Sequence, residues 1–288
     1  MTSATPNPDK CGVAIADIRH DGGRFGFLIM HRLGGSPADV KYVADGLGED
    51  GYSVDCPLLY GHGGSRALLA ATTWQQWFDT VLEAHERLSQ RCDVVVAGGL
   101  GVGAMLALQL AAERPAKVQG LALFAPTFWP NGWAMPWYGS ALRAIGSKRL
   151  ANLFRFDERP PYGIKDDALR AQSLQNLSQD GRRRDDVLGR SGGTMLEVKW
   201  LAQATERRLG QVTQPCLIFH PRHDDRSALS ASQMLQKRLG GVVDLVVLDD
   251  SYHLVTLDRQ RQLVLDKVLD FATALPGLLA PSEPVDVD

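Results

Sequence analysis

The sequence lacks the apolar segments that would carry it into or across a membrane. No run approaches the ~18 consecutive apolar residues that a membrane-spanning helix needs. The first residues, MTSATPNPDKCG, are polar and contain no apolar stretch of the kind found in signal peptides. We therefore expect a cytoplasmic protein with no membrane span.

An excess of charge of one sign is also missing, because 31 Lys and Arg residues stand against 33 Asp and Glu residues. A nucleic-acid-binding surface usually shows a basic excess or stripe. The one dense basic run, Arg182 to Arg184, is followed directly by Asp185 and Asp186, which is typical of a solvated loop. These features argue against a nucleic-acid partner.

Cysteine is sparse, and its four residues lie far apart at Cys11, Cys56, Cys92 and Cys216. They form neither a C-x-x-C pair nor the Cys and His spacing of a zinc site. Buried free thiols are the simplest interpretation. We expect neither a disulfide framework nor a metal, and no motif indicates a cofactor.

What the sequence does contain is a regular alternation of short apolar runs and amphipathic segments. The first run, FGFLIM from Phe25 to Met30, predicts a buried strand, and a helix follows with Ser36 as N-cap and Pro37 as first helical residue. Further strands are predicted at YSVDCPLL, DVVVA, GLALFAP, QPCLIFH and VDLVVL, with helices between them. Near-continuously apolar strands that alternate with helices indicate a parallel sheet covered on both faces.

The alternation stops after LFAP and resumes at QPCLIFH. The segment between them is rich in tryptophan, proline, glycine and charge, and it is too long for a plain connection. We expect residues 127–208 to form a helical cap over the carboxyl edge of the sheet, and residues 1–126 and 209–275 to form the α/β core. Residues 276–288 have nothing to bury, which predicts a disordered tail.

The stretch VVVAGGLGVGAMLAL, Val94 to Leu108, combines a buried strand, a glycine-rich turn and the start of a helix. In many hydrolases this turn has the pattern G-x-S-x-G, with the nucleophilic serine at its apex. Here Gly101 stands at the apex, between Gly99 and Gly103. The turn has the spacing of a nucleophile elbow without the nucleophile.

With three further motifs, this turn resembles the α/β-hydrolases of the bacterial carboxylesterase and monoacylglycerol-lipase type, from about Phe25 to Leu275. In the family's order the motifs are IMHRLGGSPADVKYVADGL, LLYGHGGS, the elbow, and the pair HPRHDD and DDSYHLVTLD. The resemblance implies an α/β-hydrolase fold, with a mostly parallel central sheet flanked by helices and an inserted helical cap.

The resemblance also implies roles for individual residues. Asp224 corresponds to the acid of the catalytic triad, with Asp225 as a neighbouring alternative, and His253 corresponds to the base. The backbone N–H groups of Leu33 and Val102 correspond to the oxyanion hole. In such a triad the histidine takes the serine proton, and the carboxylate orients the imidazole and stabilises its cationic form.

Two positions depart from the family pattern at the centre of the site. Gly101 replaces the serine, so no acyl-enzyme can form there, and Arg32 replaces the glycine that follows His31 in the oxyanion loop. Arg32 is long enough to reach into the space that Gly101 leaves. An engineered replacement of the serine would also explain Gly101, but the independent change at Arg32 favours natural divergence.

The aromatic residues of the expected cap form either its own core or the wall of an acyl pocket. Trp129, Trp133 and Trp137 are candidates for substrate binding. Arg32 is another candidate, since a guanidinium beside two N–H donors favours a carboxylate or similar anion. The expected partner is a small ester, fatty-acyl or anionic molecule, and the sequence does not indicate an oligomeric state.

Three hypotheses follow for the activity. In the first, the chain is a non-catalytic or strongly impaired homologue that binds its ligand. In the second, His253 and Asp224 activate a water at Gly101 and hydrolyse esters without a covalent step. In the third, the natural protein is an ordinary serine esterase and Gly101 was introduced. The first agrees best with two changes in one site, and the sequence leaves open whether the chain is an enzyme.

Overall fold

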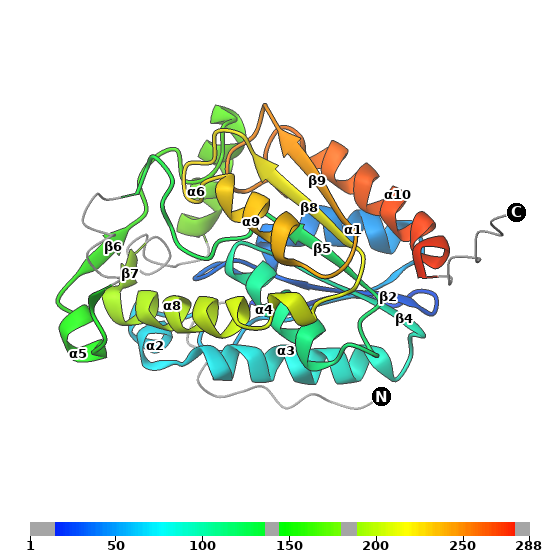
Figure 1. The fold of residues 1–288 in the computed structure, drawn as a ribbon. Helices are drawn as coiled ribbons and strands as arrows, with labels where there is room; N and C mark the ends of the chain where they lie inside the picture. Colours follow the sequence, from blue (N-terminus) through cyan, green and yellow to red (C-terminus); the bar gives the residue numbers. More distant parts are fainter. Residues whose placement is uncertain (1–14, 136–143, 180–188, 280–288) are drawn as a thin grey trace, which may run out of the picture.

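The computed structural model describes residues 15–135, 144–179 and 189–279, and a mostly parallel sheet with helices on both faces dominates it (Figure 1). In the described residues seven strands form this sheet in the order β1-β3-β2-β4-β5-β8-β9, and only β1 pairs antiparallel, with β3. The predicted strands are confirmed. The strands are β1 (Ile18–His20), β2 (Phe25–Met30), β3 (Ser53–Cys56), β4 (Val94–Leu100), β5 (Gly120–Phe124), β8 (Cys216–Pro221) and β9 (Val243–Leu248).

The edge strand β1 is an addition to the predicted set. Its three residues, IRH, are too short and too polar to stand out as an apolar run. The strand forms because its backbone pairs with β3, where Ile18 lies opposite Cys56. Such pairing is a tertiary contact that local sequence does not reveal.

Two apolar clusters hold the helices on opposite faces of the sheet. One contains residues of α3, α4 and α8, and the other contains residues of α1 and α10. In Figure 1 these two groups of helices lie on opposite sides of the strands. The helices and 3-10 turns around the sheet are η1 (Pro37–Val40), α1 (Lys41–Glu49), α2 (Arg66–Ala71), α3 (Trp74–Ser89), α4 (Val102–Glu113), α8 (Gly192–Glu206), η3 (Leu209–Gln211), α9 (Ser230–Arg238) and α10 (Arg261–Leu279).

Local signals start several of these helices. Ser36 is the N-cap as predicted, and its N–H donates to Oδ2 of Asp39 at 3.3 Å in a capping box, although the first turn is the 3-10 helix η1. Helix α3 starts at a second capping box, in which Thr73 and Gln76 bond each other's backbone N–H groups. These caps satisfy N–H groups that have no partner inside the helix.

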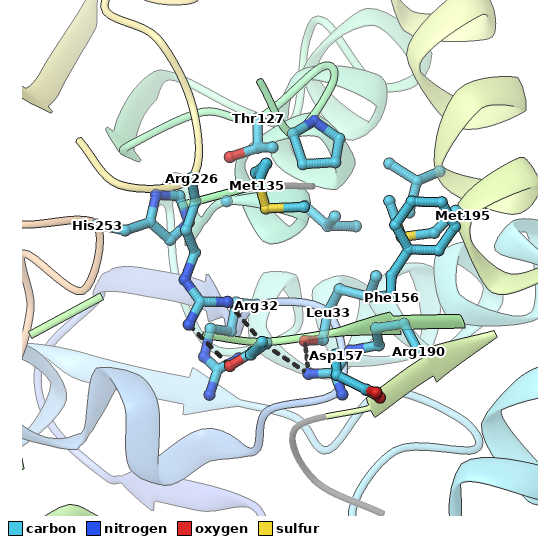
Figure 2. A pocket seen from close by; sticks show the side chains of 15 residues that line it. Arg32, Leu33, Thr127, Met135, Phe156, Asp157, Arg190, Met195, Arg226 and His253 are labelled. Atoms are coloured by element: carbon cyan, nitrogen blue, oxygen red, sulfur yellow. Dashed lines mark hydrogen bonds and ion pairs between the residues drawn. The ribbon is translucent and has the colours of Figure 1, made fainter. Parts of the chain in front are cut away.

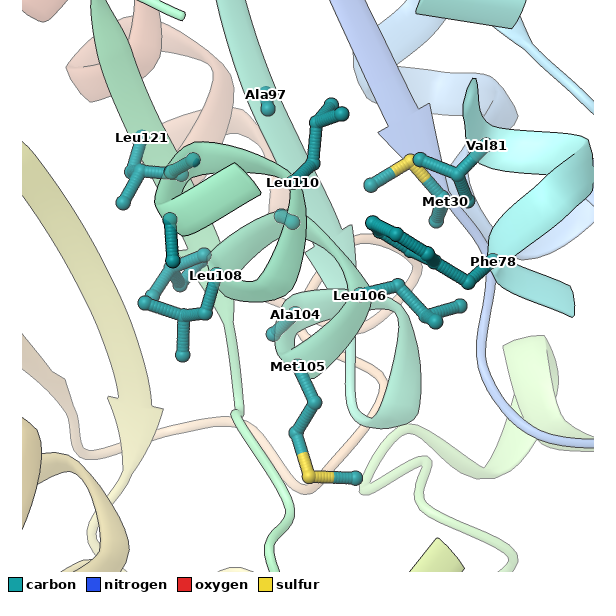
Figure 3. Close-up of a cluster of buried hydrophobic side chains, with 14 of the residues drawn as sticks. Met30, Phe78, Val81, Ala97, Ala104, Met105, Leu106, Leu108, Leu110 and Leu121 are labelled. Atoms are coloured by element: carbon teal, nitrogen blue, oxygen red, sulfur yellow. The ribbon is translucent and has the colours of Figure 1, made fainter. Parts of the chain in front are cut away.

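Helix α4 is buried around almost its whole circumference, which fixes the turn that precedes it. Figure 3 shows Leu106 directed toward Phe78 of α3, while Leu108 lies on the side of Leu121 from β5. A helix that is apolar all round belongs inside the molecule. Full burial of each large aliphatic side chain contributes about 1.5–3 kcal/mol, so this helix holds its N-terminal end in place.

The segment between β5 and β8 carries two short strands that were not predicted. Strands β6 (Arg155–Asp157) and β7 (Gly189–Ser191) pair antiparallel. The same segment also contains the helices α5 (Lys148–Ala151) and α6 (Asp167–Gln179). Three-residue strands are too short to show an alternating pattern. The following helix, α8, packs against α4 within the same apolar cluster. The division of the chain at residue 208 stays a prediction.

The predicted tail needs a correction at its start. Helix α10 continues to Leu279, so residues 276–279 are helical and not disordered. The reason is Leu275, which is fully buried and lies against Gly120, so the helix is still anchored one residue before Pro276. Residues 280–288 lie outside the described residues.

Some expectations concern features that are spread over the chain. Cys56, Cys92 and Cys216 are buried free thiols, while Cys11 and the run Arg182 to Arg184 lie outside the described residues. Within the ranges that the structure describes, there is no helix with the length and apolarity needed to cross a membrane. The same ranges hold no group of three His, Cys, Asp or Glu side chains arranged for a metal ion.

Candidate functional site

The turn between β4 and α4 keeps the backbone of a nucleophile elbow. Gly101 has φ 59° and ψ −109°, and its N–H donates to the carbonyl of Phe124 at 2.9 Å. A Cβ built on Gly103 would lie 2.4 Å from the carbonyl oxygen of Met30, so only glycine fits beside the apex. A Cβ on Gly101 would lie 3.2 Å from Nε2 of His253. A side chain at this position would therefore start directly in front of the imidazole.

The acid and the base of the expected triad are in contact. Nδ1 of His253 donates to Oδ2 of Asp224 at 2.8 Å, and both side chains are buried. Oδ1 of Asp224 accepts the N–H groups of Arg226 at 2.7 Å and of Ser227 at 3.0 Å. Burial alone would raise the pKa of Asp224, but the charge and hydrogen bond of His253 outweigh it and lower the pKa. The ionised carboxylate leaves Nε2 of His253 as the basic nitrogen facing Gly101.

The neighbouring carboxylate, Asp225, has a different place. Its Oδ1 accepts the backbone N–H of His253 at 3.3 Å, and its Oδ2 accepts the N–H of Gly163 at 2.9 Å. Burial raises the pKa of Asp225. Of the two candidates for the acid, Asp224 bonds the imidazole, whereas Asp225 supports the backbone around it.

A second buried histidine, His220, was not singled out from the sequence. Its Nε2 donates to the carbonyl of Ser227 at 2.9 Å, and its Nδ1 accepts the hydroxyl of Ser232 at 2.8 Å. Nε2 also lies 3.5 Å from Oδ2 of Asp224. Burial lowers the pKa of His220, so the imidazole is neutral and braces the loop that carries the acid. Its place at the end of the QPCLIFH strand is the signal that points to it.

The oxyanion loop is braced by His31. Its Nδ1 donates to the carbonyl of Arg32 at 2.8 Å, and its Nε2 accepts the N–H of Leu59 at 3.1 Å. The ring of His62 packs edge-on against His31, with 5.0 Å between the centroids. Leu33 and Val102 line the same cavity as Gly101, and Val102 is the first residue of α4, where N–H groups lack partners inside the helix.

The guanidinium of Arg32 does not fill the space beside Gly101. Its Nη1 donates to Oε1 of Glu158 at 2.8 Å, and its Nε lies 3.4 Å from Oδ2 of Asp39. Two more arginines converge on the same glutamate. Nη2 of Arg190 donates to Oε1 at 3.0 Å, and Nη1 and Nη2 of Arg226 lie 2.7 Å from Oε1 and Oε2. Arg32, Arg190, Arg226 and Glu158 together form what we call the arginine cluster.

The arginine cluster is almost completely removed from solvent, with side chains no more than 12% exposed. Burial alone would raise the pKa of Glu158, but the charges of Arg226, Arg32 and Arg190 outweigh it and hold the pKa far below its ordinary value. Burial lowers the pKa of Arg190 to about 10. Glu158 is therefore ionised, and three buried cations surround it.

The arginine cluster and His253 line one cavity at the carboxyl ends of the strands. In Figure 2 the arginines gather at one side of this cavity, while Phe156 and Met195 lie at another and His253 faces it. The apolar lining residues include Leu33, Val102, Met135, Phe156, Met195 and Val198. The cavity has a charged side and an apolar side.

Two of the three tryptophans expected at the site, Trp129 and Trp133, are not among the described residues that line the cavity. Trp129 is buried in a small apolar cluster with Phe156 and Met195, behind the residues that line the cavity. Trp133 is 61% exposed and packs edge-on against Tyr252. Trp137 lies outside the described residues. Of Trp129 and Trp133, one packs in the interior and one lies at the surface, so the aromatic residues of this segment do not share one role.

Known proteins resemble the chain over the sheet and the cavity residues. A family model described as serine aminopeptidase, S33 matches residues 26–260. A thermostable monoacylglycerol lipase of Bacillus sp. (strain H-257) is 26% identical over 263 residues, covering 87% of this chain and 91% of the relative. A carboxylesterase of Bacillus subtilis (strain 168) is 24% identical over 265 residues, covering 88% of this chain and 94% of the relative. A solved structure from work on LipS and LipT, two metagenome-derived lipolytic enzymes, has a TM-score of 0.75 at 25% identity. The match covers 92% of this chain and 99% of that chain.

Proposed function

The chain belongs to the serine aminopeptidase family within the α/β-hydrolases, and we propose that it is a ligand-binding homologue of esterases that forms no acyl-enzyme. The observation that carries this proposal is the apex of the elbow. Gly101 holds the backbone conformation of the nucleophile and faces Nε2 of His253, but it has no hydroxyl. In a serine protease, loss of the nucleophile lowers kcat by about 10⁶.

The lining of the cavity supports a small acyl or anionic ligand. Ligand pockets are mostly apolar and carry a few polar groups that orient the ligand. Here Phe156 and Met195 supply apolar surface, and Arg32 and Arg226 supply positive charge. The proposed ligand is a small ester, an acyl compound or the corresponding acid.

Two substitutions at one position test the proposal. Gly101→Ser restores the hydroxyl, and Gly101→Ala adds the same Cβ without it. We expect a fluorophosphonate probe to leave the wild type and the alanine variant unmodified in intact-protein mass spectrometry, and to add one adduct to the serine variant. Covalent labelling of the wild type, together with turnover of p-nitrophenyl butyrate, would show that another residue acts as nucleophile and would contradict the proposal.

The same serine variant tests the hypothesis that an ordinary esterase carries Gly101 in place of its serine. Under that hypothesis the rest of the site, including the loop with Arg32, is competent. Turnover of p-nitrophenyl butyrate at 1–10³ s⁻¹, roughly the range of typical enzymes, supports it. Labelling without turnover indicates that the site around Arg32 has diverged as well.

A second candidate function is ester hydrolysis by a water in place of the serine. The hydrogen bond between His253 and Asp224 favours it, because an imidazole oriented by a carboxylate can act as a general base. If wild-type protein hydrolyses p-nitrophenyl butyrate slowly, His253→Ala should abolish that activity and Asp224→Asn should strongly reduce it. Activity that survives His253→Ala comes from another source and excludes this function.

A further inference from the structure

The arginine cluster holds more positive charge than its glutamate neutralises. Three guanidinium groups meet the single carboxylate of Glu158. The next carboxylates are more distant, because Asp39 lies 3.4 Å from Nε of Arg32 and Asp225 lies 3.8 Å from Nε of Arg226. Both of these Nε atoms are buried and have no hydrogen-bond partner among the described residues. Buried N–H groups without acceptors are costly, so the cluster favours a further anion.

The cluster is already shaped for a carboxylate. Arg226 holds Glu158 with both terminal nitrogens, one on each carboxylate oxygen, while Arg32 adds a third donor. Paired, planar contacts of this kind are the ones in which guanidinium groups recognise carboxylates. Arg190 differs from the other two arginines, since it is also tied to the carbonyls of Leu33 and Gly189. Arg32 and Arg226 are the arginines with donor capacity left for a ligand.

The arginines that carry these donors belong to the lining of the cavity that also contains the elbow and the base. Arg32, Arg226 and Glu158 line it together with Gly101 and His253. On another side, Phe156 and Met195 offer apolar surface (Figure 2). A molecule with a charged head and a short alkyl chain matches both sides at once.

We infer that the cavity binds a short-chain carboxylate, with its head group on Arg32 and Arg226 and its alkyl chain against Phe156 and Met195. Glu158 is then an internal competitor, which pairs with the arginines when the cavity holds no ligand. This inference rests on the proposed function, because it names the ligand of the same cavity. Its own content is that the ligand is negatively charged and that Glu158 competes with the ligand for the arginines.

Hexanoate and hexanamide test this content, because they have nearly the same shape and differ in charge. We expect calorimetric titration of the full chain at fixed ionic strength to show hexanoate binding at least about tenfold more tightly, since hydrogen bonds to a charged group are the stronger ones. Arg226→Gln and Arg32→Gln should remove this preference. Arg222→Gln is the matched control, because Arg222 is exposed and pairs with Asp249 away from the cavity.

The decisive variant is Glu158→Gln, because its expected effect is tighter binding of hexanoate, which a misfolded protein would not show. Removal of the internal carboxylate should strengthen hexanoate binding several-fold and leave hexanamide binding unchanged. Equal affinity of wild type for hexanoate and hexanamide, or no gain in Glu158→Gln, overturns the carboxylate site but leaves the proposed function standing. Binding of neither compound, nor of methyl hexanoate, contradicts the proposed function as well.

Discussion

Nδ1 of His253 lies 2.8 Å from Oδ2 of Asp224, while its Nε2 faces a glycine at the position of the nucleophile. The expected acid–base pair is thus joined by a hydrogen bond, and no serine stands in front of Nε2 of His253. The structure adds a second feature beside Gly101, since Arg32 is paired with Glu158 from the segment between β5 and β8.

A side chain at the elbow should cost stability. Gly101 has φ 59°, where residues with a Cβ are strained, so Gly101→Ser and Gly101→Ala should each lower the free energy of unfolding by about 1–3 kcal/mol. Urea denaturation measures the change. Gly210→Ala is the control, because a Cβ there meets no atom within 4 Å, and it should change stability by less than about 0.5 kcal/mol. An unchanged midpoint for both elbow variants would show that the turn carries no strain.

The arginine cluster should make stability depend on pH in the acid range. The pKa of Glu158 lies far below its ordinary value of 4.5 in the folded protein, so its ionised form stabilises the fold above that pH. This contribution is lost progressively as the pH falls below 4.5. Urea midpoints measured from pH 7 to pH 3 should therefore fall less steeply in Glu158→Gln than in wild type.

At neutral pH, urea denaturation of Glu158→Gln tests whether the charges of the arginine cluster are buried and paired. Glu158→Gln leaves three buried arginines without their carboxylate, which should lower the free energy of unfolding by roughly 3–5 kcal/mol. Glu49→Gln serves as the control, because Glu49 is exposed on α1. Equal effects of the two substitutions would contradict a buried, paired Glu158.

His220 should act as a positioning residue for the acid. His220→Ala leaves the hydroxyl of Ser232 and the carbonyl of Ser227 without their partner, and we expect a loss of about 1–3 kcal/mol in the free energy of unfolding. In the Gly101→Ser background it should also lower kcat for p-nitrophenyl butyrate with little change in KM. His220→Gln should recover part of the kcat, because its amide also donates and accepts. A stability loss without any change in kcat would make His220 purely structural.

Two tryptophans from the same segment should respond differently to truncation. Trp129 is buried among Phe156 and Met195, so Trp129→Ala should cost about 3–5 kcal/mol. Trp133 is 61% exposed, and Trp133→Ala should change stability by less than about 0.5 kcal/mol and leave hexanoate affinity unaltered. Thermal and urea denaturation measure the stabilities. A loss of hexanoate binding in Trp133→Ala would return this residue to the ligand site.

The sequence predicted the parts of the site that lie in contiguous motifs. The elbow around Gly101 and the turn after QPCLIFH each follow a strand, and parallel strands place their carboxyl ends at one edge of the sheet. The resemblance to the family implied His253 as the base, and the structure brings His253 to Asp224. The resemblance implied Asp224 as the acid with Asp225 as an alternative, and only the folded loop shows that Asp224 bonds the imidazole of His253 while Asp225 accepts its backbone N–H.

The arginine cluster could not be predicted from the sequence, because its members are far apart along the chain. Arg32 and Glu158 are separated by 126 positions, and Glu158 follows β6, a strand too short to predict. Arg190 comes from β7, which forms only by pairing with β6. From sequence alone, a charged residue in a loop is expected to be exposed to solvent. Only the folded structure shows that it is buried in an ion pair.

The sequence by itself determined the strands of the parallel sheet and the glycine-rich turn without a serine at its apex, because apolar periodicity and glycine spacing act within a few residues of one another. Only the tertiary structure decided which carboxylate bonds His253, where the guanidinium of Arg32 points, and which side chains line the cavity. Those outcomes depend on burial and on contacts between distant segments. Such contacts exist only after the segment between β5 and β8 has packed against the sheet.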